Sequence, residues 1–102
     1  ATLLRIVKAG LDFCERSGGA FDITVMPIVN FYGFGFEPGE NRFPTVAEID
    51  AWLQLTGCDR LEAGDSTLAK LDPRVSIDLS AIAKGDGVDR VADFLLEQGY
   101  TN

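Results

Sequence analysis

The sequence predicts an α+β fold in which helices pack on a small, mainly antiparallel sheet. Segments 2–16, 46–56 and 81–98 carry apolar residues at helical spacing and end close to a glycine. Short strand-like runs follow one another through turn sequences, without the regular strand–helix alternation of a doubly wound sheet. With 102 residues, the chain is one domain at most.

Local signals define the ends of the predicted helices. Gly18-Gly19 follows the first helix as a stop signal. Thr45, with Glu48 three residues later, matches a capping box that starts the second helix. Ser80 is the expected cap of the last helix.

The remaining segments are predicted as strands, turns and one loop. Strands are expected at four places: 20–25, 59–63, 67–71 and 75–79. Turn residues at Gly64-Asp65-Ser66 indicate a hairpin between the second and third of them. Segment 26–32 has Pro27 near its start and fits one or two helical turns, and 33–40 is expected to be a loop.

Composition excludes several classes of function for these residues. The formal charge of −7 and the lack of a basic stripe argue against a nucleic-acid partner. Histidine is absent, which removes Ser-His-Asp and Cys-His catalysis and the commonest zinc ligand from this segment. No run of about 20 apolar residues is present, so we expect no membrane contact by this segment.

The two cysteines match no metal or redox spacing. Cys14 falls on the apolar face of the first predicted helix, so a buried thiol is the favoured interpretation for it. A disulfide between Cys14 and Cys58 stays open as the alternative.

The segment from Val75 to Asp89 is the richest in candidate chemistry. It is predicted to run from a strand through a polar corner at Asp78 into a helix with Lys84 one turn inside. The free N–H groups and partial positive charge of a helix N-terminus suit a phosphate group. A plain capped turn, with Asp78 bonded to its own backbone, is the competing interpretation.

Further residues of the same helix are given structural interpretations. Gly85-Asp86-Gly87 fails the dinucleotide fingerprint, because Arg90 stands at the third glycine position, so close helix packing is favoured over ligand contact. Asp86, Asp89 and Asp93 are expected to be solvated.

A second constellation lies at the end of the first predicted helix. In the run from Ser17 to Asp22, small residues flank Phe21 and an acid follows it. The structural interpretation is a helix stop. The functional interpretation is a site where the backbone holds a flat heterocycle by hydrogen bonds. The aromatic residues of 31–36 fit a core, a lid or a partner contact equally well.

These two regions carry a resemblance to a known family. The first block extends from Ser17 to Asn30 (SGGAFDITVMPIVN) and continues into Tyr32-Gly33-Phe34-Gly35. The second extends from Ile77 to Gly85 (IDLSAIAKG), with Val88-Asp89-Arg90 behind it. Both blocks closely resemble signature blocks of the ApbE family, the FAD:protein FMN transferases once called thiamine-biosynthesis lipoproteins, and they occur in the family's order.

The resemblance implies a transferase that uses FAD and a divalent metal, usually magnesium. Such an enzyme moves FMN from FAD to a Ser or Thr hydroxyl of a target protein and releases AMP. Some relatives hydrolyse FAD to FMN and AMP instead. The chain resembles the middle portion of a larger ApbE-like domain, and its start without Met and its end just past a helix stop fit a piece of a longer protein.

Site residues carry over position by position. Ala20, Phe21 and Asp22 match the family's Ala-Phe-Asp segment, which contacts FAD, and Asp78 matches the acid of its Asp-Leu-Ser block. Lys84 matches a further FAD-contact position, where a point charge would suit the pyrophosphate. Ala81 matches a metal position, for which its backbone carbonyl oxygen is the plausible ligand.

The sequence also departs from the family pattern. Asp86 stands where relatives often carry an aromatic residue, and its charge should weaken phosphate binding unless it points to solvent. The family's C-terminal metal-ligand segment and its N-terminal Met-Gly-Thr stretch are absent from the chain. We therefore expect 1–102 to be a partial domain with little or no transferase activity by itself.

Two other functions stay open beside the transferase. They are an FAD pyrophosphatase with the same site and a non-catalytic flavin-binding domain. The resemblance implies a periplasmic or membrane-anchored parent, FAD as the small-molecule partner, and a flavin-accepting target protein.

Overall fold

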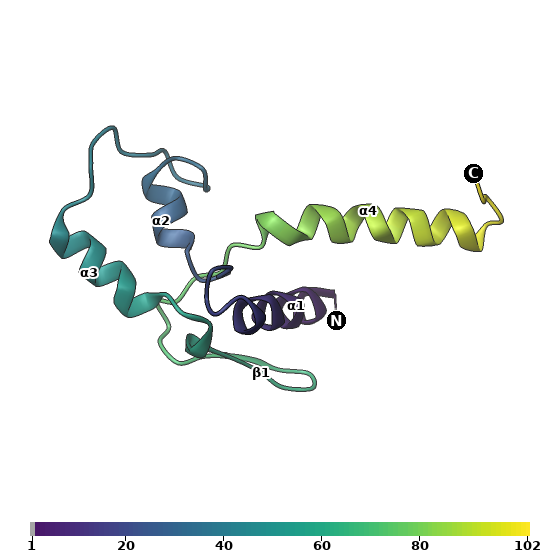
Figure 1. Ribbon diagram of the computed structural model, residues 1–102, viewed down its shortest axis with the longest axis horizontal. Coiled ribbons are helices and arrows are strands. Elements are labelled where there is room, and N and C mark those ends of the chain that lie inside the picture. The colour runs from purple at the N-terminus through teal and green to yellow at the C-terminus, as the bar shows by residue number, and fades with distance from the viewer. Residues whose placement is uncertain (1) are drawn as a thin grey trace.

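The computed structural model describes residues 2–102 and confirms the α+β class. The elements in chain order are α1 (Thr2–Arg16), α2 (Met26–Phe31), α3 (Val46–Leu55), the 3-10 helix η1 (Cys58–Arg60), β1 (Leu61–Ala63), β2 (Leu68–Lys70) and α4 (Ser80–Glu97). In Figure 1, α1 lies near the centre, α2 and α3 lie to one side, and α4 projects to the other. The chain measures 55 × 32 × 23 Å, with a radius of gyration of 16.4 Å against about 13 Å for a compact domain of this length. The projecting α4 accounts for the elongation.

The predicted stop after α1 is confirmed. Gly18 and Gly19 adopt φ values of +63° and +85°, which side chains with a Cβ rarely tolerate. The N–H of Gly19 donates to the carbonyl of Cys14 at 2.8 Å. The apolar face of α1 is buried through Val7, Gly10 and Cys14.

The capping box of α3 is confirmed as well. The Thr45 hydroxyl accepts a hydrogen bond from the Glu48 N–H at 3.2 Å, and the Glu48 carboxylate accepts one from the Thr45 N–H at 3.4 Å. Arg42 holds the same carboxylate with two further hydrogen bonds of 2.8 and 3.1 Å. The helix therefore starts where the sequence predicts.

β1 and β2 form an antiparallel hairpin, as predicted, with Leu61 opposite Lys70 and Ala63 opposite Leu68. Both strands are shorter than the predicted ones. β1 starts late because Cys58–Arg60 form a 3-10 turn where the sequence predicts the start of the strand. The turn closes with a 2.8 Å hydrogen bond from the Gly64 N–H to the Thr67 carbonyl.

The strands predicted at 20–25 and 75–79 are wrong. Within residues 2–102 neither segment joins a sheet. A backbone hydrogen bond, from the Asp78 N–H to the Ile23 carbonyl at 2.7 Å, links them. Near Asp22 the backbone turns, because its carboxylate accepts the N–H of Thr24, and this local bond competes with a ladder.

Both segments are nonetheless anchored in the core. Ile23 and Val75 are buried against Val7 of α1 and Leu61 of β1. Partly buried apolar residues surround this cluster: Leu11, Phe21, Leu68, Ile77 and Leu79. The core thus lies directly beneath the two segments that the sequence singles out.

α4 is predicted at 81–98 and found at Ser80–Glu97. Its later turns are exposed, including the apolar residues Val88, Val91, Phe94, Leu95 and Leu96. No helix of the part described, residues 2–102, combines the length and the hydropathy needed to cross a bilayer.

Candidate flavin-nucleotide site

The two sequence blocks meet at one point of the fold. The hydrogen bond between the Asp78 N–H and the Ile23 carbonyl joins them at 2.7 Å. Asp78 is the donor of this bond, and Asp22 directly precedes the acceptor, Ile23. Two of the predicted FAD-contact residues are therefore brought close along the backbone.

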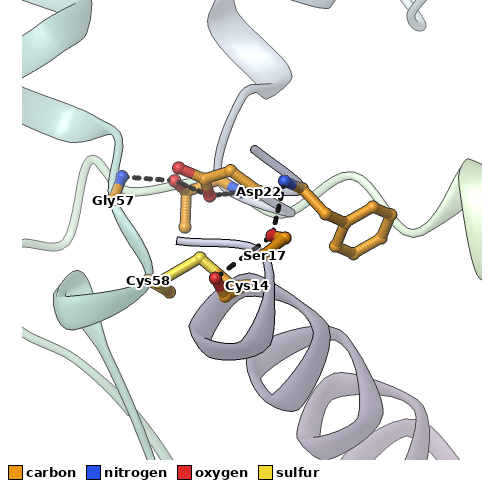
Figure 2. The surroundings of a disulfide bond; sticks show 7 residues. Cys14, Ser17, Asp22, Gly57 and Cys58 are labelled. Atoms are coloured by element: carbon orange, nitrogen blue, oxygen red, sulfur yellow. Dashed lines mark hydrogen bonds between the residues drawn. A yellow bond between two sulfur atoms is a disulfide. The ribbon is translucent and has the colours of Figure 1, made fainter. Parts of the chain in front are cut away.

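Asp22 is held by a short chain of hydrogen bonds (Figure 2). One of its carboxylate oxygens accepts from the Thr24 N–H at 2.8 Å and from the Thr24 hydroxyl at 2.6 Å. The Thr24 hydroxyl oxygen accepts in turn from the Gly57 N–H at 2.7 Å. Thr24 is fully buried, so its hydroxyl has a fixed set of partners.

Ala20 and Phe21 lie on the turn that follows α1. The Phe21 N–H donates to the Ser17 hydroxyl oxygen at 2.9 Å, and that hydroxyl donates to the Cys14 carbonyl at 3.2 Å. The Phe21 ring is half-buried and stands edge-on to Phe13 at 5.8 Å between centroids. Ala20 is exposed.

The N-cap residue of α4 is Leu79, which makes no side-chain capping bond, and the side chain that bonds the start of the helix belongs to Asp78. The Asp78 carboxylate accepts the Ser80 N–H at 2.9 Å. The prediction that Ser80 caps the helix is wrong, because Ser80 is itself the first helical residue. The capped-turn interpretation is the one seen, and the carboxylate takes an N–H that a phosphate at this helix end would use.

Ala81 and Lys84 lie in the first turns of α4, and both are exposed. Ala81 lines a hollow of about 360 Å³ between α1 and α4. Arg5 and Phe13 line it from α1, and Gly85 and Asp86 from α4. Asp22 lines a different groove, of about 300 Å³, which also includes Cys14, Gly57 and Cys58.

The expectation that Asp86 is solvated is wrong. Its carboxylate forms an ion pair with Arg5, and its side chain is only 15% exposed. The packing of α1 beside the start of α4 brings the guanidinium over this carboxylate and neutralises its charge. Asp89 and Asp93 are exposed, as predicted.

The prediction that Gly85 and Gly87 allow close helix packing is also wrong among residues 2–102. A Cβ built on either glycine meets no atom of residues 2–102 within 4 Å. These glycines line an open face of α4.

A metal site is not formed by these residues alone. Across residues 2–102, no group of three or more His, Cys, Asp or Glu side chains is placed to hold an ion. Magnesium takes six oxygens in near-ideal octahedral geometry. Ala81 offers one carbonyl oxygen, which has a lone pair to spare beyond its helical hydrogen bond. The donors present therefore do not fit a complete magnesium site.

Cys14 and Cys58 form a disulfide, with Cα atoms 6.3 Å apart (Figure 2). The favoured interpretation of Cys14 as a buried thiol is wrong, although Cys14 is fully buried. The end of α1 lies beside the start of η1, a proximity that helical spacing alone does not reveal. The bond closes the same groove that Asp22 lines.

The turn before Val75 carries the clearest electrostatic shift. Arg74 donates two side-chain hydrogen bonds and one backbone hydrogen bond to Asp72, and this lowers the pKa of that carboxyl to about 2. Lys70 donates to the Pro73 and Val75 carbonyls at 2.7 and 2.9 Å. Together these bonds fix the approach to the Asp78 segment.

Sequence reasoning missed Thr24, Gly57 and Arg5. An Asp followed two residues later by Thr is typical of a side-chain turn, so Thr24 carried a readable signal. The roles of Gly57 and Arg5 depend on tertiary contacts, so no local sequence signal could have identified these two residues.

This combination of folded elements and paired sequence blocks defines a class. The sequence model of the ApbE family matches residues 1–102, and the chain belongs to that family.

Individual relatives agree with this assignment. The chain is 43% identical over 99 residues to an FAD:protein FMN transferase of Vibrio cholerae, covering 97% of the chain and 30% of the relative. It is 45% identical over 109 residues to one of Haemophilus influenzae, covering 100% and 31%. The chain therefore spans about a third of the length of these proteins.

Solved structures agree as well. Flavin transferase ApbE from Vibrio cholerae superimposes with a TM-score of 0.89 at 44% identity, over 94% of this chain and 31% of that one. The apo flavinyl transferase ApbE of Pseudomonas stutzeri gives 0.86 at 34% identity, over 94% and 32%.

Proposed function

We propose that this chain forms part of the flavin-nucleotide site of an FAD:protein FMN transferase. The observation that carries the proposal is the Asp78–Ile23 hydrogen bond, which joins the two ApbE signature blocks beside Asp22. The names of the relatives support the same activity.

In this proposal Ala20, Phe21, Asp22 and Asp78 contact FAD. Asp22 and Asp78 each use one carboxylate oxygen in their turns and keep the other for a ligand. Lys84, exposed on α4, supplies a point charge to the pyrophosphate.

The metal part of the proposal is limited to one atom. Ala81 would offer one backbone oxygen to a magnesium ion, which would need further ligands beyond those of residues 2–102. When bound, the ion would neutralise phosphate charge.

The proposed reaction breaks the phosphoanhydride bond of FAD and forms a phosphate ester. A Ser or Thr hydroxyl of the target protein attacks the phosphorus of the FMN half of FAD. The new P–O bond forms as the pyrophosphate P–O bond breaks, AMP leaves with the bridging oxygen, and the hydroxyl proton is released to solvent. Positioning and charge neutralisation dominate catalysis of this kind.

Flavin binding is the first test. Calorimetric titration of the 102-residue chain with FAD should give a measurable affinity that K84A weakens by roughly tenfold, the order expected for a lost hydrogen bond to a charged group. Lys8 is an exposed lysine of α1, so K8A is the matched control. Equal losses in both variants would contradict the assignment of Lys84.

Product analysis separates the three candidate functions. FAD labelled in its flavin half, incubated with the parent protein, magnesium and an acceptor protein, should leave label on an acceptor hydroxyl. Free labelled FMN would favour the pyrophosphatase. Unchanged FAD would favour the non-catalytic binding domain. The 102-residue chain alone should give no turnover.

The disulfide bears on where the parent protein works. Disulfides persist in oxidising compartments and are rare in the cytosol. The Cys14–Cys58 bond therefore supports a periplasmic or otherwise exported parent.

A further inference from the structure

The disulfide and the hydrogen bonds of Asp22 close a single ring (Figure 2). From Cys58 the chain passes to Gly57, whose N–H donates to the Thr24 hydroxyl oxygen at 2.7 Å. The Thr24 hydroxyl donates to Asp22 at 2.6 Å. The turn that precedes Asp22 is bonded to the end of α1 at Cys14. The Cys14 carbonyl accepts the Gly19 N–H at 2.8 Å and the Ser17 hydroxyl at 3.2 Å.

Gly57 is the sensitive member of this ring. Its φ of +129° is a conformation that residues with a Cβ rarely adopt, and a Cβ there would lie 2.5 Å from an Asp59 carboxylate oxygen. The Gly57 N–H therefore points at Thr24 only while the Gly57–Cys58 backbone is held in place. The covalent bond from Cys58 to Cys14 constrains that backbone, beside the 3.0 Å hydrogen bond from the Arg60 N–H to the Gly57 carbonyl.

Thr24 transmits this constraint to Asp22. The side chain is fully buried, and its hydroxyl uses both its hydrogen and its oxygen, one toward Asp22 and the other toward Gly57. Losing Gly57 would leave a buried hydroxyl oxygen without its donor, which is unfavourable. Thr24 and Asp22 would then be free to rearrange.

We propose that the Cys14–Cys58 disulfide and Thr24 act as one redox-sensitive positioning device for the Asp22 carboxylate. A dithiol reductant supplies two electrons and two protons to the S–S bond. It is oxidised to its own disulfide and leaves two cysteine thiols. Gly57 then separates from Thr24, and the Thr24 hydroxyl is released from its fixed position, which leaves the bond from the Thr24 N–H as the local hold on Asp22. Only the consequence for FAD affinity rests on the proposed function.

Amide hydrogen exchange tests the device without any flavin. In the ¹⁵N-labelled 102-residue chain, dithiothreitol should lower the protection of the Gly57 and Thr24 amides at least tenfold, with little change at Leu11 inside α1. Unchanged protection at Gly57, or an equal loss at Leu11, would overturn the proposal. Free thiols at both cysteines in non-reducing peptide mapping would overturn it too.

Two variants at Thr24 test whether the parts act together. T24V has nearly the same shape without the hydroxyl, and T24S keeps the hydroxyl. With the disulfide intact, T24V should lose Gly57 protection to the level of the reduced chain, and T24S should keep it. Reduction of T24V should add little further loss, because both changes break the same link. Losses that multiply would show two independent effects and overturn the single device.

The flavin consequence has a separate readout. Reduction should weaken FAD binding by the wild-type chain and should leave T24V, already weakened, nearly unchanged. A chain that responds in exchange as expected yet never binds FAD supports the device and contradicts the proposed function.

Discussion

The Asp78 N–H donates a 2.7 Å hydrogen bond to the Ile23 carbonyl, and this bond joins two segments that are far apart in the sequence. Asp22 and Asp78 both use a carboxylate oxygen to bind a backbone N–H two residues ahead, at 2.8 and 2.9 Å. The two candidate flavin contacts thus have the same local geometry. In each, a turn fixes the side chain through one oxygen and leaves the other without a hydrogen bond from residues 2–102.

The cap of α4 gives a direct test of the Asp78 geometry. D78A should lower the free energy of unfolding by about 1 kcal/mol, the usual cost of losing a helix cap. D78N keeps an acceptor oxygen and should lose less than half of that. S80A should be nearly silent, because the Asp78 carboxylate bonds the backbone N–H of residue 80 and Ser80 is itself the first helical residue. Urea unfolding followed by circular dichroism measures all three. A larger loss in S80A than in D78A would contradict the assignment.

Gly10 is predicted to resist substitution although it lies within a helix. Alanine there would place a Cβ 2.8 Å from the Ile23 side chain, which is fully buried and cannot move freely. Overpacking of this kind costs about 1–3 kcal/mol and should exceed the gain of about 1 kcal/mol in helix propensity. G10A should therefore destabilise the chain.

Gly87 supplies the matched control for Gly10. It lies in α4, and a Cβ added there would meet no atom of residues 2–102 within 4 Å, so G87A should stabilise the helix by about 0.5–1 kcal/mol. Thermal unfolding of both variants gives the comparison. Stabilisation by both would show that the α1 contact with Ile23 is loose.

The capping box of α3 predicts a local loss of stability. T45A removes the acceptor of the Glu48 N–H and should cost about 1 kcal/mol, whereas T45S keeps the hydroxyl and should cost little. Chemical denaturation compares the two variants. If T45A and T45S were equally stable, the hydroxyl would contribute nothing to the helix start.

The Asp72–Arg74 pair predicts a pH dependence at the acid end. Because the folded-state pKa of Asp72 is lowered to about 2, its contribution to stability is full above the unfolded-state pKa and is lost as the pH falls through about 2. R74Q should raise the pKa of Asp72 toward the ordinary aspartate value, and R16Q, in α1, should not. Carboxyl carbon NMR shifts against pH provide the measurement. The same Asp72 pKa in R74Q and the wild-type chain would contradict the pairing.

Several features of the fold could be predicted from the sequence, because they depend on neighbouring residues. The glycines after α1, the Thr45–Glu48 box and the hairpin are local signals, and the structure confirms them. The alternating pattern of segments 20–25 and 75–79 predicts strands that the structure does not contain. That pattern indicates a half-buried segment. It does not indicate whether a neighbouring strand is present to form the hydrogen-bond ladder of a sheet.

The site is predictable only in part for the same reason. The two signature blocks are contiguous in sequence, so a resemblance identifies their residues. The Cys14–Cys58 bond, the Gly57–Thr24 bond and the Arg5–Asp86 pair each join residues from distant parts of the chain. Such pairings depend on how α1 meets η1 and α4, which no local spacing encodes.

The Arg5–Asp86 pair yields the last prediction, which concerns flavin binding. Arg5 is 58% exposed, so breaking the pair should change stability by less than about 1 kcal/mol. In the proposed function, Asp86 lies near the phosphates contacted by Lys84. R5Q would leave its charge uncompensated and should weaken FAD binding by roughly two- to fivefold, D86N should strengthen it, and the double variant should match the wild-type chain. These differences should shrink at high salt, where exposed charges are screened. Calorimetric titration at low and high salt measures them. If R5Q and D86N changed the affinity in the same direction, the pair would act on FAD through structure and not through charge, and Asp86 would lie away from the phosphates.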